Sequence, residues 1–215
     1  ALRTRLDLDI PSQVGLCQHR DAAGTLCGQP LDAKGQHSRS CRKGGWLVKK
    51  HNSIVDELAV WCNNNHAYTI KEAILPNANP DHPEARIDLV VQIPGHATIY
   101  VDVTIVSALA QEPIRRGSAA KDGVACELAA RAKQAKYPGI IVCAFVVEEH
   151  GRFGEDAMNF LRKVAPLDPA LRPIALSGIY QTVSTLVQRW QAEAIIASCT
   201  TSAHFHGPPR AQRAV

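Results

Sequence analysis

Two apolar runs that each contain one aspartate constrain the fold of this chain more than any other feature. Asp88 lies within residues 85–91 and Asp102 within residues 99–106, and thirteen residues separate the two acids. Both runs are rich in β-branched residues and predict strands, and the turn residues at 94–96 predict that the strands form a hairpin. An ionised carboxylate that is buried without a partner costs about 3–5 kcal/mol. Two acids at matched positions therefore predict a shared metal ion.

An acid pair that shares a metal ion is typical of sites that hydrolyse phosphodiesters. The simpler alternative is that one or both aspartates lie at strand ends and accept hydrogen bonds from backbone N–H groups. The residues after the second acid make this alternative less favourable. They include a helix with Lys133 and Lys136 near its end, and two lysines there can also be a solvated face that stabilises the helix dipole.

The segment that follows predicts an α/β fold. Alanine and leucine at helical spacing predict a helix over residues 118–137, which ends at a Pro-Gly pair. Residues 140–147 form an unbroken apolar run, which is typical of a strand covered on both faces. Two further amphipathic helices are expected at residues 155–164 and 182–198. Together these elements predict an α/β sandwich in which helices cover the sheet.

Three of the seven cysteines lie, together with His37, in a polar, glycine-containing segment near the N-terminus. These residues are Cys17, Cys27, His37 and Cys41. Such a segment cannot form an apolar core, and three cysteines with one histidine are an accepted ligand set for structural zinc. Two alternatives remain, namely free thiols and a set in which His19 replaces Cys17.

Length and charge agree with a small nucleic-acid-binding protein without requiring one. The 215 residues can bury one core and a small N-terminal metal module, and the net charge is only +4. Basic residues gather in two short clusters, Arg42, Lys43, Lys49 and Lys50, then Arg115, Arg116 and Lys121. No apolar run is long enough to span a bilayer, so no membrane partner is expected.

In their order along the chain, these motifs resemble the restriction-like endonuclease domain of site-specific, early-branching non-LTR retrotransposons, which belongs to the PD-(D/E)XK nucleases. The family pattern is a Cys/His cluster, a basic-His-Asn segment, a strand ending in glutamate, two aspartates and a Lys-x-x-Lys-Tyr sequence. The matching residues are Cys27, His37 and Cys41, then Lys50-His51-Asn52, Glu72, Asp88 and Asp102, and Lys133-Gln134-Ala135-Lys136-Tyr137. The resemblance extends from residue 17 to residue 195.

Two positions depart from the general pattern of these nucleases. Ile87 stands where a proline usually precedes the first aspartate, and Thr104 stands where a lysine is expected after the second. In the retrotransposon family this lysine is moved to the following helix. The resemblance therefore makes Lys133 or Lys136 the candidate for the catalytic lysine.

The resemblance implies an Mg²⁺- or Mn²⁺-dependent endonuclease that nicks target DNA so that the free 3′ hydroxyl primes reverse transcription. The implied metal ligands are Asp88, Asp102, the Val103 carbonyl and Glu72, with Glu57 as a rival to Glu72. The implied catalytic residues are Asp88, Asp102, Lys133, Lys136 and Glu72, and the implied DNA contacts are Lys49, Lys50, His51, Arg115, Arg116 and Tyr137. The N-terminal cluster would hold Zn²⁺ as a zinc knuckle.

The resemblance also implies an organisation and a setting. We expect a zinc-knuckle segment at residues 1–45, a restriction-endonuclease-like domain with a mixed sheet flanked by helices at 46–200, and a disordered basic tail at 201–215. Because the first residue is not methionine, we expect the C-terminal part of a polyprotein with a reverse transcriptase upstream. The implied partners are DNA and the RNA of the element, in the nucleus. The alternatives are a catalytically silent nucleic-acid-binding module and a structure-selective nuclease similar to Holliday-junction resolvases.

Overall fold

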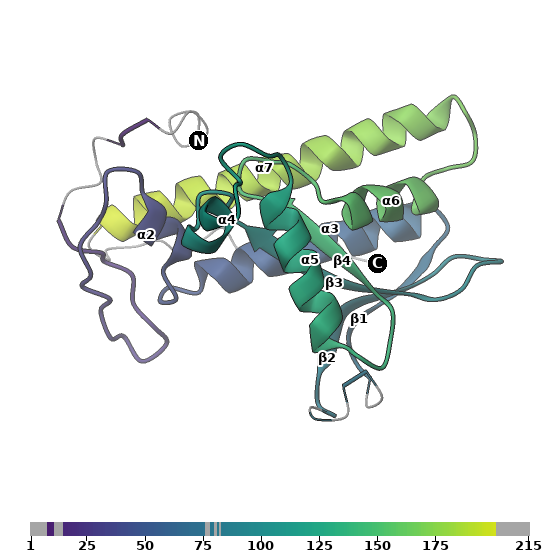
Figure 1. Cartoon of the computed structure of the whole chain (residues 1–215), viewed down its shortest axis with the longest axis horizontal. Coiled ribbons are helices and arrows are strands. Elements are labelled where there is room, and N and C mark those ends of the chain that lie inside the picture. The colour runs from purple at the N-terminus through teal and green to yellow at the C-terminus, as the bar shows by residue number, and fades with distance from the viewer. Residues whose placement is uncertain (1–7, 11–14, 76–77, 80, 82, 201–215) are drawn as a thin grey trace, which may run out of the picture. The chain divides into compact units, whose positions relative to one another are not determined.

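The computed structural model describes residues 8–10, 15–75, 78–79, 81 and 83–200 (Figure 1). The tail predicted at residues 201–215 lies outside the described residues. The chain divides into two compact units, one made of Ala1–Leu47 with Gln191–Val215 and the other of Val48–Trp190. Residues 191–200 thus group with the described N-terminal residues, whereas the sequence predicted boundaries after residues 45 and 200.

A four-stranded mixed sheet forms the centre of the unit Val48–Trp190. Its strands are β1 (Tyr68–Ile74), β2 (Arg86–Gln92), β3 (Ile99–Val106) and β4 (Val142–Glu148), and they lie in the order β1-β2-β3-β4. The first three strands are antiparallel neighbours, and β4 pairs with β3 in parallel. The hairpin predicted for the two aspartate runs is therefore confirmed as β2 and β3.

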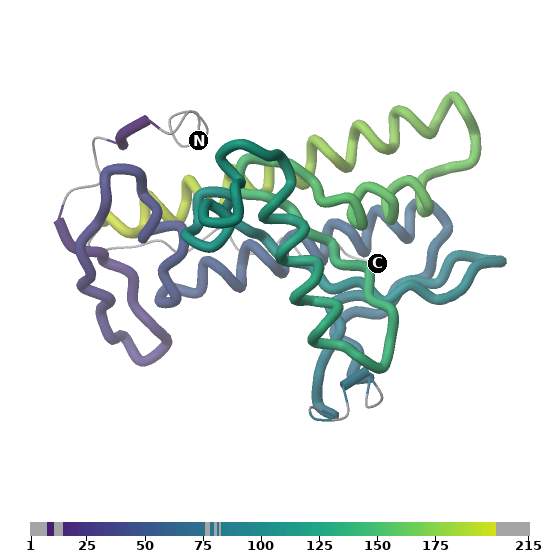
Figure 2. The backbone as a smooth tube through the Cα atoms, viewed as in Figure 1, coloured from purple at the N-terminus to yellow at the C-terminus, as the bar shows by residue number. Residues whose placement is uncertain are grey.

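The parallel pairing of β3 and β4 requires a crossover, which Figure 2 traces as a continuous path. The crossover contains α4 (Gln111–Arg115) and α5 (Val124–Lys136). The sequence predicted one helix over residues 118–137, but α5 begins only after Gly123, whose φ of 81° lies in the left-handed region. The helix predicted at residues 155–164 is confirmed as α6 (Glu155–Val164).

Two long helices complete the architecture. α3 (Trp46–Asn64) precedes the sheet, and α7 (Leu171–Cys199) ends the described chain; the division between the two units falls within both helices. α7 starts earlier than the predicted residue 182. Pro173 is compatible with this start because it falls in the first turn, where a missing N–H costs no helical hydrogen bond. No helix in the described part of the chain combines the length and apolar character needed to cross a membrane.

The two faces of the sheet are covered by different helices. Residues of α3, α6 and α7 pack with Leu89, Val101 and Phe145 in the largest apolar cluster. On the opposite face, α5 packs its Cys126 against Ala144 and Val146 of β4. This arrangement brings α3 and α5 to the sheet from opposite sides, as the ribbon in Figure 1 shows.

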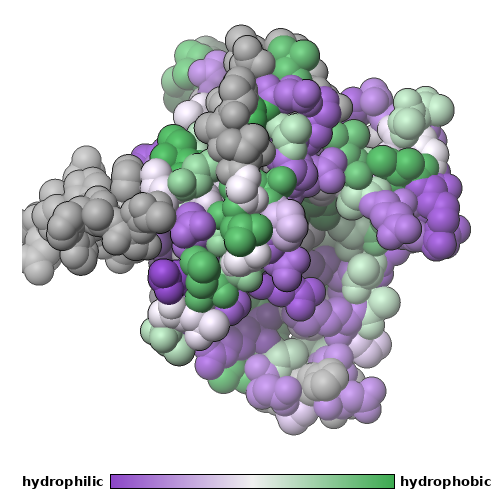
Figure 3. Space-filling model, turned by 90° about the vertical axis from the view of Figure 1, so that its left-hand side faces the viewer, coloured by the Kyte–Doolittle hydropathy of each residue, from purple (hydrophilic) through white to green (hydrophobic). Residues whose placement is uncertain are grey.

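In the other unit, the described residues form little regular structure apart from α2 (Gln36–Ser40) and the ends of the two long helices. Short bridges between Leu16 and Pro30 and between Arg20 and Leu26 fold residues 16–30 into an irregular hairpin. On the face drawn in Figure 3, hydrophilic and hydrophobic residues are interspersed.

Candidate functional site

The two aspartates predicted to share a metal ion lie where β2 and β3 separate. The pairing of these strands runs from Val91 opposite Ile99 to Leu89 opposite Val101, and stops before Asp88. Beyond this point the backbone N–H of Val103 donates to Asp88 Oδ2 at 2.6 Å. The Asp88 carboxylate therefore takes the place that a backbone carbonyl would have in a continued ladder.

The pairing of β1 with β2 is interrupted at the same level. Lys71 pairs with Leu89 and Ala73 with Ile87, but Glu72 between them has a φ of 54°. A positive φ is uncommon for a residue other than glycine and marks local strain. The backbone pairing of β2 with both of its neighbours is thus interrupted beside Asp88.

Asp102 is the more deeply buried acid of the pair. Its position in β3 is opposite Ala144 of β4, and the residue is only 2% exposed. Lys133 Nζ, from α5, lies 2.7 Å from Asp102 Oδ1, whereas Lys136 Nζ lies 3.8 Å from Oδ2, too far for a hydrogen bond. Oδ2 is buried without a hydrogen-bond partner among the described residues.

The end of α5 that carries the two lysines is anchored to the sheet and to the loop after β1. The buried Tyr137 donates its hydroxyl proton to the carbonyl of Arg86, at 2.8 Å. Asn79 Nδ2 donates to the Lys136 carbonyl, also at 2.8 Å. The Lys136 ammonium lies 4.7 Å from the centre of the Tyr137 ring. These contacts explain how a helix end can present lysine side chains to a fixed point on β3.

His51 contacts the acid pair, which the sequence did not predict. Its Nε2 lies 3.2 Å from Asp88 Oδ1, so α3 contributes to the site as well as α5. The signal was in the spacing: His51, Ile54, Val55 and Leu58 follow the i, i+3, i+4, i+7 pattern of one helix face. The last three are buried, so His51 begins the face of α3 that packs on the sheet.

The two carboxyl groups have pKa values shifted in opposite directions. Burial raises the pKa of Asp102 above its usual value, and the nearby Lys133 ammonium only partly offsets this. Burial also raises the pKa of Asp88, but the hydrogen bond and charge of His51 and the Val103 N–H outweigh it, so the net shift is downward. The hydrogen bond to Asp88 raises the pKa of His51 in turn. Such a split is typical of coupled acids in functional sites.

The donor set at the fork of β2 and β3 fits a hard divalent cation. Carboxylate oxygens are the ligands that Mg²⁺ and Mn²⁺ prefer, and Asp102 Oδ2 is a buried acceptor that lacks a hydrogen-bond donor in the described structure. Glu72 lies across from Asp88 in the register of β1, but its residue is exposed. Among the described residues, the side chains of Glu72, Asp88 and Asp102 do not come close enough together to form a group of three metal ligands.

The residues predicted to contact DNA are found in different surroundings. Lys50 is 5% exposed and its Nζ lies 3.9 Å from Glu149 Oε1, and Tyr137 is fully buried. Burial removes both from the surface that a phosphate backbone could reach. Lys49 is exposed, as are Arg115 and Arg116, which form ion pairs with Glu112 on α4.

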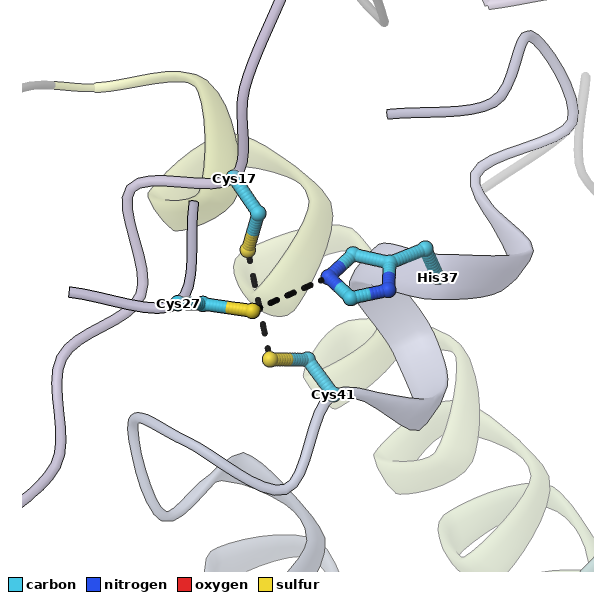
Figure 4. A group of neighbouring side chains, drawn as sticks. All are labelled: Cys17, Cys27, His37 and Cys41. Atoms are coloured by element: carbon cyan, nitrogen blue, oxygen red, sulfur yellow. Dashed lines mark hydrogen bonds between the residues drawn. The ribbon is translucent and has the colours of Figure 1, made fainter. Parts of the chain in front are cut away.

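Cys17, Cys27, His37 and Cys41 form one compact group in the N-terminal unit (Figure 4). Their ligand atoms all lie within 4.8 Å of one another. The Cys17 and Cys41 sulfurs are 3.9 Å apart, and Cys27 Sγ is 3.4 Å from His37 Nε2. Tetrahedral zinc with Zn–S bonds of about 2.3 Å separates its sulfur ligands by about 3.8 Å. The group could therefore hold a metal such as zinc.

Local structure explains how these four side chains meet. The irregular hairpin of residues 16–30 places the first two cysteines, with the Cys27 N–H donating to the His19 carbonyl at 2.8 Å. Asp32 accepts hydrogen bonds from the backbone N–H groups of Gln36 and His37, which fixes the start of α2. His19 is not part of the group, because it is buried with its Nε2 2.9 Å from the Ala194 carbonyl.

Burial raises the pKa of Cys17 and Cys41, whereas at Cys27 hydrogen bonds outweigh burial and the pKa is lowered. Burial and the neighbouring Cys41 raise the pKa of Cys17 to about 12. A bound divalent cation would offset the repulsion between thiolates and favour the deprotonated ligands. Outside the group, Cys62 and Cys126 are buried free thiols, and burial raises the pKa of each to about 12.

No protein-family model matches this chain, and no curated protein shows significant sequence similarity to it.

Proposed function

We propose that this chain is a metal-dependent DNA endonuclease that nicks its target, in the manner of the restriction-like domain of non-LTR retrotransposons. The observation that carries the proposal is the buried Asp102 carboxylate, which has Lys133 on one oxygen and a buried, unbonded second oxygen beside Asp88. The mixed sheet flanked by helices agrees with the restriction-endonuclease-like fold that the motifs imply.

In the proposed site, Asp88 and Asp102 hold an Mg²⁺ or Mn²⁺ ion, with the Val103 carbonyl as a further ligand. Glu72 is the proposed further acid, but its side chain would have to move toward the pair, because it is exposed and forms no close group with the two aspartates. The bound ion would lower the pKa of a coordinated water and offset the negative charge that develops on the phosphate. Lys133 is the proposed catalytic lysine, because its ammonium lies directly against the acid pair. From there it can orient a water molecule or stabilise the phosphate oxygens. Lys136 is half exposed and is the proposed contact for the incoming phosphate.

The N-terminal cluster is the proposed zinc site, with Cys17, Cys27, His37 and Cys41 as its ligands. Because the surrounding segment has little regular structure, zinc bound there would contribute directly to its folding. Lys49, Arg115 and Arg116 remain the proposed DNA contacts. DNA, the RNA of the element and an upstream reverse transcriptase remain proposed partners, and the nucleus the proposed location.

The test is nicking of supercoiled plasmid by the purified chain with Mg²⁺ or Mn²⁺, beside the variants Asp88→Asn and Asp102→Asn. Asp122→Asn is the matched control, because its carboxylate is 82% exposed and pairs with Arg152 away from the acid pair. We expect metal-dependent nicking by the wild type and by Asp122→Asn, and loss of nicking in the other two variants. Plasmid binding should persist in all four proteins, because the exposed cations are unchanged.

Binding of plasmid without any metal-dependent nicking would refute the proposal and favour the silent nucleic-acid-binding module. A wild type that cuts a four-way junction but leaves linear duplex and plasmid intact would favour the resolvase-like alternative.

A further inference from the structure

Both carboxylate oxygens of Asp88 are held by groups outside its own strand. Val103 N–H donates to Oδ2 at 2.6 Å, and His51 Nε2 lies 3.2 Å from Oδ1. The backbone pairing of β2 with its neighbours is interrupted beside this residue, so the position of its carboxylate depends on these two contacts. Two donors on opposite oxygens define both the position and the rotation of the group.

His51 lies on α3, a helix whose neighbouring residues are packed in the main core. It lies one turn before Ile54 and Val55, which are 0% and 3% exposed, in a helix that packs in the main core with Leu89 and Val101. Its own side chain is only 27% exposed. A side chain carried by a packed helix is held more precisely than one on a loop, which suits a residue that orients a ligand.

The same geometry argues against the DNA contact that the sequence predicted for His51. Its Nε2 faces Asp88, so this ring nitrogen is not available to a phosphate oxygen, and only Nδ1 is left to reach one. The neighbours in the motif differ from it, since Asn52 is exposed and Lys50 is buried beside Glu149. Each residue of Lys50-His51-Asn52 therefore has a separate environment.

We propose that His51 is a positioning residue that fixes the Asp88 carboxylate for metal binding, and that it does not contact DNA. The proposal rests on the metal-dependent nuclease function above. Removal of an outer partner of a metal ligand typically lowers metal affinity or activity by about 10–100-fold. His51→Ala should therefore weaken the binding of Mn²⁺ by about that factor and leave the affinity for DNA within about twofold.

The experiment measures Mn²⁺ binding by electron paramagnetic resonance and DNA binding in Ca²⁺, for the wild type, His51→Ala, His51→Gln and Asn52→Ala. Single-turnover cleavage is then followed at several Mn²⁺ concentrations. We expect the rate of His51→Ala to approach that of the wild type only at high Mn²⁺. His51→Gln should recover part of the affinity, because its amide can donate to Asp88. Asn52→Ala is the control and should match the wild type.

A His51→Ala protein that loses DNA affinity while its Mn²⁺ affinity is unchanged would overturn the inference in favour of a DNA contact. An unchanged Mn²⁺ affinity and rate would overturn it as well. These results differ from a failure of the proposed function, in which the wild type itself neither binds Mn²⁺ nor cleaves. Circular dichroism identifies a variant that fails to fold, and His51→Gln then provides the comparison.

Discussion

The two lysines near the end of α5 have different relations to Asp102. Lys133 Nζ is 2.7 Å from one carboxylate oxygen and its side chain is 23% exposed, whereas Lys136 Nζ is 3.8 Å from the other oxygen and 50% exposed. The sequence placed both lysines on the correct helix but could not rank them. Which lysine lies closer to Asp102 depends on the rotation of the helix about its axis, and packing against the sheet decides that rotation.

The first prediction separates these lysines. Lys133→Ala should lower the single-turnover cleavage rate at saturating DNA by about 10²–10³-fold, because it removes a charged group fixed at the reacting centre. Lys136→Ala should mainly weaken DNA binding, and its rate at saturating DNA should stay within about tenfold of the wild type. Equal effects of the two substitutions on rate and affinity would contradict the assignment.

The second prediction concerns adjacent lysines of α3 that differ in burial. Lys50→Ala removes an ammonium that lies 3.9 Å from Glu149 Oε1, where both side chains are at most 10% exposed. The free energy of unfolding in urea should fall by about 3 kcal/mol, because a buried carboxylate loses a cationic partner. Lys49→Ala is the control and should change it by less than about 0.5 kcal/mol, as expected for an exposed side chain. Similar effects of both substitutions would show that burial does not distinguish them.

At the scale of elements, the strands and α6 were predictable because their signals are local. The β-branched runs around the aspartates defined β2 and β3, and amphipathic spacing defined residues 155–164. The sequence could not locate the start of α5, since Gly123 interrupts an alanine-rich stretch that looks helical throughout. The strand fork was equally hidden, because the break in pairing at Asp88 arises from contacts with Val103 and His51 across the fold.

The third prediction concerns the Cys/His cluster and the segment around α2. Cys41→Ser should abolish stoichiometric zinc binding and speed hydrogen exchange over residues 15–47, because structural zinc supplies folding free energy to its segment. Cys199→Ser is the matched control: this cysteine belongs to the same unit but not to the cluster. Zinc analysis and hydrogen-exchange mass spectrometry provide the readouts. Full zinc content in Cys41→Ser would rule out the proposed ligand set.

At the scale of the whole molecule, composition says less about the candidate site than the distances between residues that lie far apart in the sequence. A net charge of +4 neither requires nor excludes nucleic acid, whereas the distant Asp88, Asp102 and Lys133 meet at one point on the sheet. The grouping of residues 191–199 with the N-terminal unit was not predictable, because it depends on pairings such as Ser38 with Ser198, 160 residues apart. Local patterns carry no information about such contacts.

The central claim is that Asp88 and Asp102 bind the divalent ion that cleavage requires. Its most direct test is a titration with Mn²⁺ followed by electron paramagnetic resonance, on the zinc-loaded wild type and on the Asp88→Asn/Asp102→Asn double variant. We predict saturable binding by the wild type and its loss in the double variant, with the fold retained by circular dichroism. Saturable binding that survives in the double variant, or no binding by the wild type, would contradict the claim.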